Sequence, residues 1–186
     1  MMRNKGGFTL VEMLVTISVT LILSGILIGY SREAGKHLVL VNNQAKLVSL
    51  IARAKSLSTA TFFEGTLPLN PGDPRICGYG VHVDTVSGEI FIFRDLAVDC
   101  VMNGDNRFGS GDIPLTGQLN VFELTPQVTQ FASDMTLDDI IFIPPDPTII
   151  INGDTSLKEA MISIEVKDGS SKSIIKINNA GRISTK

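Results

Sequence analysis

Residues 8–31 read FTLVEMLVTISVTLILSGILIGYS, and this stretch decides how the chain is built. The nineteen residues from Met13 to Ser31 carry no charge and are rich in Leu, Ile and Val. A helix of that length spans roughly 28 Å, close to the hydrocarbon thickness of a bilayer. The run is longer than the apolar core of a cleavable secretory signal, and its small-residue sites near Gly25 and Gly29 are poor cleavage sites. We therefore predict a membrane-spanning helix over residues 8–30.

Glu12 is the only charged residue in this stretch. A carboxylate in hydrocarbon costs about 2.5–3.5 kcal/mol unless it has a partner. Cleavage after Gly7 would give Phe8 a positively charged amine one helical turn before Glu12, on the same face. A plain signal anchor accounts for the length and for Arg3 and Lys5, but it explains Glu12 only as a chance residue at the membrane surface. The pattern favours proteolytic maturation and assembly, with the pair formed inside one helix or between two.

The segment Lys5-Gly6-Gly7-Phe8-Thr9-Leu10-Val11-Glu12 resembles the prepilin signature of type IV pilins and type II secretion pseudopilins. The resemblance implies that residues 1–7 are a leader removed by prepilin peptidase. It also implies that Phe8 becomes the N-methylated terminus and that Glu12 pairs with the terminus of a neighbouring subunit. Other pilin subunits and an inner-membrane assembly platform are then the expected partners.

The helical period continues beyond the apolar run, and no proline occurs before Pro68. We expect one helix from about Phe8 to Thr59, whose outer, amphipathic half lies against a folded domain. We expect its core-facing stripe to consist of Ala34, Leu38, Val41, Ala45, Val48, Ala52 and Leu57.

The pattern changes to β-strands from about residue 76. Gly78–Val83 and Glu89–Arg94 alternate on either side of Ser87-Gly88 and predict a hairpin. A second hairpin is predicted around the turn Asp168–Ser171. The other strand candidates are Asn120–Thr125, Ile140–Ile143, Thr148–Ile151, Ala160–Lys167 and Ser173–Asn178. The predicted fold class is α+β, a long N-terminal helix packed on antiparallel sheet in a head of residues 31–186.

Charge and residue types argue against several functions. The charged fraction is 19%, and from Ser31 onward 14 basic residues face 18 acidic ones, a net charge of −4 that does not favour phosphate binding. His37 and His82 have no evident nucleophile with a catalytic context, so we expect no enzyme. The pair Asp138-Asp139 precedes an apolar strand, and we expect it to cap or solubilise that strand.

Cys77 and Cys100 flank the first predicted hairpin. In an oxidising exterior we expect a disulfide between them, worth about 3 kcal/mol in the loop-entropy model. Two buried free thiols are the alternative. Two cysteines and two scattered histidines do not make a closed zinc site, so no metal is expected there.

The segment Asp99–Asp112 has the composition of an ion-binding loop. Asp99, Asn103, Asp105 and Asp112 offer oxygen ligands for calcium, but no register fits an EF-hand and Arg107 would place a positive charge inside. Asn-Gly and Asp-Asn are also common in turns. We favour a loop without calcium, and no cofactor is expected.

The head carries a second resemblance. Gly78–Val81, Ile92–Asp95 and the closing Asn179–Arg182 are similar to the GspH/FimT group of low-abundance pseudopilins. This resemblance implies a subunit at or near a filament tip. Some relatives bind DNA through a C-terminal motif with two arginines; here Arg182 matches, but Ser184 stands in the second position.

We therefore predict a minor pilin or pseudopilin, a single-pass protein of the cytoplasmic membrane whose head is extracytoplasmic and enters a periplasmic or extracellular filament. The alternative is a DNA-binding minor pilin for DNA uptake. A signal-anchored extracytoplasmic protein of another kind is a third hypothesis.

Overall fold

The computed structural model describes residues 9–64, 73–100, 106–144 and 148–186. The chain divides into two compact units, Met1–Leu38 and Val39–Lys186. Helix α1 (Leu10–Glu64) contributes its inner half to the first unit and its outer half to the second, which holds the described strands. One long helix with antiparallel sheets confirms the predicted α+β class.

Helix α1 is 55 residues long and extends a few residues beyond the predicted end at Thr59. Its length follows from an uninterrupted run of residues compatible with a helix, with no proline from Leu10 to Glu64. Gly65 and Pro68 come next in the sequence, and both residue types commonly follow a helix end.

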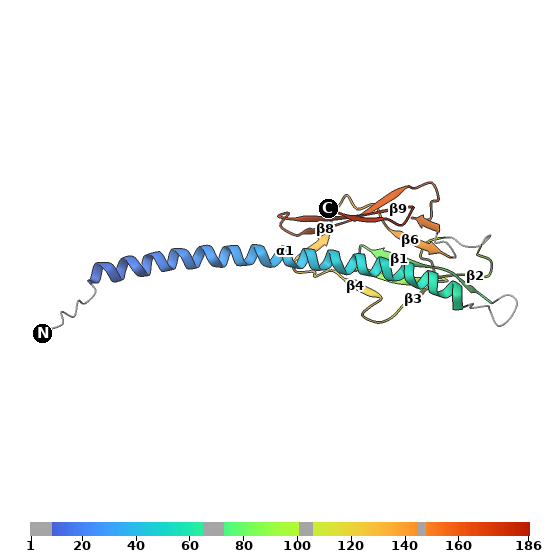
Figure 1. The fold of residues 1–186 in the computed structure, drawn as a ribbon, viewed down its shortest axis with the longest axis horizontal. Coiled ribbons are helices and arrows are strands. Elements are labelled where there is room, and N and C mark those ends of the chain that lie inside the picture. The colour runs from blue at the N-terminus through green and yellow to red at the C-terminus, as the bar shows by residue number, and fades with distance from the viewer. Residues whose placement is uncertain (1–8, 65–72, 101–105, 145–147) are drawn as a thin grey trace. The chain divides into compact units, whose positions relative to one another are not determined.

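The larger of the two described sheets, sheet A, is antiparallel and has the strand order β3-β2-β1-β6-β7, with β4 paired to the same edge of β2 as β3. Figure 1 labels most of these strands, together with β8 and β9 of the second sheet. The long strands β1 and β2 form the predicted hairpin, with Gly88 at φ 79° in its turn. The strands are β1 (Arg75–Asp84), β2 (Glu89–Ala97), β3 (Ile113–Pro114), β4 (Val121–Glu123), β6 (Asp139–Ile143) and β7 (Thr148–Ile151).

Sheet B is antiparallel and has the order β10-β9-β8-β5. Its centre is the second predicted hairpin, β8 (Glu159–Val166) with β9 (Lys172–Asn178), whose turn places Gly169 at φ 73°. Its edges are β5 (Thr129–Phe131) and β10 (Ile183–Thr185). The sequence did not predict β3, β5 or β10, because two or three residues are too few to show an alternating pattern.

The outer half of α1 packs on both sheets and forms one core with them. Leu47, Ile51 and Ala54 are almost completely buried there, together with side chains of β1, β2, β6, β8 and β9. Two buried polar side chains fix the helix: Asn43 Nδ2 donates to Thr129 Oγ1 of β5 (3.1 Å), and Ser58 Oγ donates to the Phe142 carbonyl of β6 (2.7 Å).

The predicted core-facing stripe of α1 is wrong at five of its seven positions, whereas Val48 and Leu57 are partly buried and pack against the core. Leu38 is 68% exposed and Val41 46% exposed, and Ala34, Ala45 and Ala52 are also exposed. A period near 3.6 fits two faces of this helix, and the face with the larger side chains is the buried one. That face consists of Leu40, Asn43, Leu47, Leu50, Ile51, Ala54 and Ser58.

A close approach between neighbouring strands explains one glycine of the Gly-Tyr-Gly-Val motif. Gly80 is the cross-strand partner of Phe93, and a Cβ at Gly80 would lie 2.3 Å from the Phe93 ring. The ring therefore covers the glycine on the sheet face opposite Tyr79 and Val81, whose side chains belong to the core with α1.

Candidate functional site

Helix α1 begins with a capping box. Thr9 is the residue before the helix, and its Oγ1 accepts a hydrogen bond from the Glu12 backbone N–H (3.3 Å). Glu12 Oε2 in turn accepts from the Thr9 backbone N–H (3.0 Å) and from Thr9 Oγ1 (3.1 Å). This reciprocal bonding satisfies donors that a helix start leaves without partners. Glu12 thus has a partner in its own chain, which the sequence analysis overlooked.

The two residues predicted to flank the cleavage site, Gly7 and Phe8, lie outside the described residues. Glu12 lies in the first helical turn, where a carboxylate also favours the positive end of the helix dipole. Its side chain is at the described start of the chain and is exposed. The hydrogen bonds from Thr9 orient the Glu12 carboxylate, and the carboxylate stays exposed.

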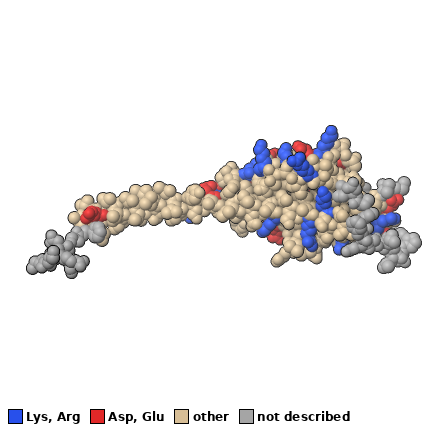
Figure 2. Space-filling model, in the orientation of Figure 1, with Lys and Arg blue, Asp and Glu red and all other residues tan. Residues whose placement is uncertain are grey.

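The inner half of α1 has an apolar surface that no other described residue of its unit covers. Leu10 is 81% exposed and Tyr30 is 76% exposed, and every side chain between them is exposed as well. Figure 2 shows this surface without Lys, Arg, Asp or Glu side chains beyond the carboxylate near its described start. Within the part of the chain that the structure describes, helix α1 contains a stretch, Leu10–Ala60, that is long enough and apolar enough to cross a membrane.

Three hydroxyl groups in this half bond to carbonyls of the helix itself. Thr16 Oγ1 donates to the Met13 carbonyl (2.9 Å), and Ser18 Oγ donates to the Leu14 carbonyl (2.8 Å). Thr20 Oγ1 donates to the Thr16 carbonyl (2.9 Å). A membrane interior offers no water to a polar group, so such internal bonds suit a helix surrounded by lipid or by other helices.

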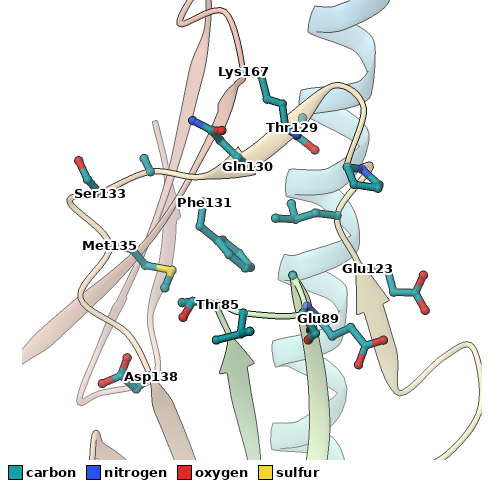
Figure 3. Close-up of a pocket in the computed structure, with 16 residues that line it drawn as sticks. Thr85, Glu89, Glu123, Thr129, Gln130, Phe131, Ser133, Met135, Asp138 and Lys167 are labelled. Atoms are coloured by element: carbon teal, nitrogen blue, oxygen red, sulfur yellow. Dashed lines mark hydrogen bonds between the residues drawn. The ribbon is translucent and has the colours of Figure 1, made fainter.

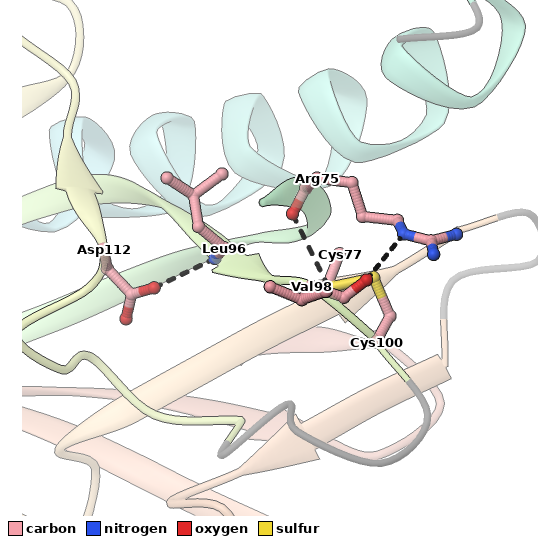
Figure 4. The surroundings of a disulfide bond; sticks show 6 residues. All are labelled: Arg75, Cys77, Leu96, Val98, Cys100 and Asp112. Atoms are coloured by element: carbon pink, nitrogen blue, oxygen red, sulfur yellow. Dashed lines mark hydrogen bonds between the residues drawn. A yellow bond between two sulfur atoms is a disulfide. The ribbon is translucent and has the colours of Figure 1, made fainter. Parts of the chain in front are cut away.

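In the head, a disulfide joins Cys77 to Cys100, with a Cα–Cα distance of 5.2 Å (Figure 4). Cys77 is an extra residue in β1, because the register with β2 shifts between Ile76 and Gly78. Such a bulge changes the direction of a side chain locally. The Arg75 guanidinium donates from Nε to the Val98 carbonyl (3.1 Å) beside the disulfide.

The loop after β2 is held at its far end by Asp112. Its Oδ1 accepts from the Leu96 N–H (3.0 Å), and its Oδ2 accepts from the Gly109 N–H (2.8 Å). Both carboxylate oxygens of Asp112, one of the oxygen groups considered as a calcium ligand, are therefore engaged by the backbone. Asn103 and Asp105 lie outside the described residues, and the described ones contain no group of three His, Cys, Asp or Glu suited to a metal.

The same loop contributes Phe108 to an aromatic cluster on β1 and β2. The Phe108 ring centroid lies 4.8 Å from that of His82, 5.1 Å from that of Phe91 and 5.2 Å from that of Phe93. His82 Nδ1 lies 2.8 Å from Asp139 Oδ1. Asp139 is buried as the first residue of β6, so the expectation that the pair solubilises the strand is wrong for Asp139, whereas Asp138 before it is exposed. The cross-strand pairing of Asp139 with His82 provides the partner that a buried carboxylate needs.

The residue behind the DNA-binding alternative, Arg182, is exposed just before β10. Two basic side chains of β9, the strand next to β10, lie beside carboxylates. Lys172 Nζ contacts Asp134 Oδ2 (2.5 Å), and Lys176 Nζ lies 3.5 Å from Glu159 Oε1. Charges paired in this way contribute little to the basic patch that nucleic-acid binding requires.

Comparison with known proteins identifies one family match. Residues 2–28 match the prokaryotic N-terminal methylation motif. No curated protein and no solved structure matches the chain, and the likeness of the head to the GspH/FimT group stays a prediction. The motif and the exposed apolar helix support a membrane-anchored, type IV pilin-like or pseudopilin subunit that assembles with other pilin subunits.

Proposed function

We propose that this chain is a minor pilin or pseudopilin, a non-enzymatic subunit of a type IV pilus or a type II secretion pseudopilus. Prepilin peptidase cuts between Gly7 and Phe8 and methylates the new terminus. The inner half of α1 holds the subunit in the cytoplasmic membrane and then packs among the helices of a filament. The observation that carries this proposal is the coincidence of the methylation motif at residues 2–28 with an apolar helix surface left exposed from Leu10 to Tyr30.

The basic residues near the N-terminus and the two cysteines support one orientation of the chain across the membrane. Arg3 and Lys5 precede the apolar run, and basic residues next to a membrane helix favour the cytoplasmic side. The disulfide between Cys77 and Cys100 lies in the head, after the apolar run, and disulfides persist in oxidising compartments. The leader is therefore cytoplasmic and the head extracytoplasmic, meeting the peptidase and the assembly platform at the inner membrane.

Glu12 has a different role before and after cleavage in this proposal. In the uncleaved chain its carboxylate accepts bonds from Thr9. Cleavage after Gly7 places a cationic amine at Phe8, and an ionised pair in a low-dielectric surrounding is stronger than a neutral hydrogen bond. The amine of a neighbouring subunit then pairs with Glu12 and sets the axial register of the two helices.

Two substitutions at Glu12 separate charge pairing from helix capping. Glutamine at the third helical position still forms a capping box, but it carries no charge for the Phe8 amine. We expect both Glu12→Ala and Glu12→Gln to insert into the membrane and be processed, yet to enter filaments poorly when sheared filaments are compared with the membrane fraction. Normal incorporation of Glu12→Gln would show that capping is the only role of this residue.

A further inference from the structure

A cavity of about 760 Å³ opens in the head between β5 and the turn that joins β1 to β2 (Figure 3). Apolar side chains form part of its wall: Phe131 and Met135 point into it, and Leu124 lines it as well. Leu124 is buried, whereas Phe131 and Met135 are half-buried. The cavity therefore offers apolar surface on one of its sides.

Carboxylates dominate the charge around this cavity. Glu89, Glu123 and Asp138 line it, against one cation, Lys167, among the described lining residues. Glu89 of β2 lies directly opposite Glu123 of β4 in the sheet register. Like charges in that arrangement destabilise a sheet, and no described Lys or Arg forms an ion pair with either carboxylate. The wall thus presents two neighbouring negative charges without a matching positive one.

The facing wall is the free edge of a sheet. β5 is an edge strand of sheet B and pairs with β8 on one side. The Ala132 N–H donates to the Ser163 carbonyl (2.9 Å), and the Lys167 N–H donates to the Val128 carbonyl (3.0 Å). The alternation of an antiparallel ladder then directs the backbone N–H and C=O of Phe131 away from β8. An edge of this kind accepts an added strand.

We propose that this cavity binds an extended polypeptide segment of a partner protein that carries basic and apolar side chains. Its backbone bonds to the free N–H and C=O of Phe131. An apolar side chain packs on Phe131 and Met135, and a Lys or Arg relieves the repulsion between Glu89 and Glu123. The inference concerns the head alone and is independent of cleavage at Gly7 and of filament formation.

The test uses the full chain in micelles of an uncharged detergent. The probe is a fluorescent hexapeptide of alternating lysine and leucine, and the counter-probe replaces lysine with glutamate. We expect saturable binding of the lysine peptide by anisotropy, and slower hydrogen exchange at residues 129–135. The combined Glu89→Gln and Glu123→Gln variant should bind at least about tenfold more weakly, about 1.4 kcal/mol. Its unfolding midpoint should be unchanged or higher, because the repulsion is gone.

A control with the same change of net charge combines Glu33→Gln and Glu159→Gln, two exposed carboxylates that do not line the cavity. It should bind the lysine peptide like the unmodified chain. Equal weakening in this control, equal binding of the glutamate peptide, protection confined to the apolar half of α1, or no saturation at millimolar peptide would each overturn the proposal.

Discussion

The inner half of α1 and the head use the same apolar residue types in opposite ways. In the inner half, Leu and Ile side chains are exposed along the whole run, as at Leu21 with 68% exposure. In the head, Leu47 and Ile51 on the same helix are almost fully buried against two sheets. Moving apolar side chains out of water is favourable, so both regions need a surface that covers them. The head buries them within its own chain, whereas the inner half needs lipid or other helices.

The polar groups of the two regions show the same contrast. In the inner half, Thr16 and Ser18 bond to carbonyls of their own helix. In the head, the buried side chains of Asn43 and Ser58 bond to strands more than eighty positions away. These two hydroxyl groups of the first region therefore find their acceptors without tertiary structure, whereas the two buried side chains of the second find theirs through it.

The largest expected loss of stability comes from shortening a leucine in the head, compared with the same substitution in the inner half of α1. Leu47→Ala should lower the free energy of unfolding of the head by about 2–5 kcal/mol, because it leaves a cavity in the core. Leu21→Ala removes an exposed side chain and should change that free energy by less than about 0.5 kcal/mol. Thermal unfolding of the head, followed by circular dichroism, compares the two variants. Similar losses would mean that the inner half contributes to the stability of the head.

Removing the disulfide should have the next largest effect, again confined to the head. Cys77 and Cys100 are 23 positions apart, and a closed loop of that size is worth about 3 kcal/mol. The combined Cys77→Ser and Cys100→Ser variant should unfold at lower denaturant concentration, with unchanged membrane insertion. Ready alkylation of both cysteines in the unmodified, non-reduced protein would contradict this expectation.

Adding a methyl group at Gly80 should lower the stability of the head by a smaller amount. Gly80→Ala would push against the Phe93 ring, and overpacking of this kind costs about 1–3 kcal/mol. Gly111→Ala is the matched control, since a Cβ there meets no atom within 4 Å. Denaturant unfolding of the two variants measures the difference. Equal stability would show that the ring moves aside without cost.

The smallest expected effect is on the stability of the head at acidic pH. A hydrogen bond from the Ser87 hydroxyl, followed by bonds from the Val86 and Ser87 N–H groups, lowers the pKa of Asp84. A carboxyl with a lowered pKa stabilises the fold at pH above its ordinary value of about 3.9, and this contribution is lost as the pH falls through the lowered value. Asp84→Asn should make the unfolding midpoint slightly less dependent on pH below about 5. Superimposable pH profiles would contradict this assignment.

Much of the fold followed from local patterns in the sequence. The alternation of Gly78–Val83 and Glu89–Arg94 around a turn glycine predicted the β1–β2 hairpin, and Gly169 marked the turn of the β8–β9 hairpin. The buried face of α1 could not be predicted in the same way. It includes Asn43 and Ser58, which occupy core positions because distant strands supply their hydrogen-bond partners.

The candidate site shows a similar division. Glu12 stood out because its charge interrupts an apolar run, but its bonds with Thr9 were overlooked. The signal was present, since Thr-x-x-Glu at a helix start is the spacing of a capping box. The pairing of His82 with Asp139 had no such local signal, because 57 positions separate the two residues.

The central claim is that the chain is processed to a new terminus and assembled through its inner helix. Mass spectrometry of the protein recovered from its native membrane or filament tests the processing directly. We predict a mature chain that begins at Phe8, lacks residues 1–7 and carries one additional methyl group on its terminal amine. A chain that keeps its leader, or one cut at another bond, would contradict the account.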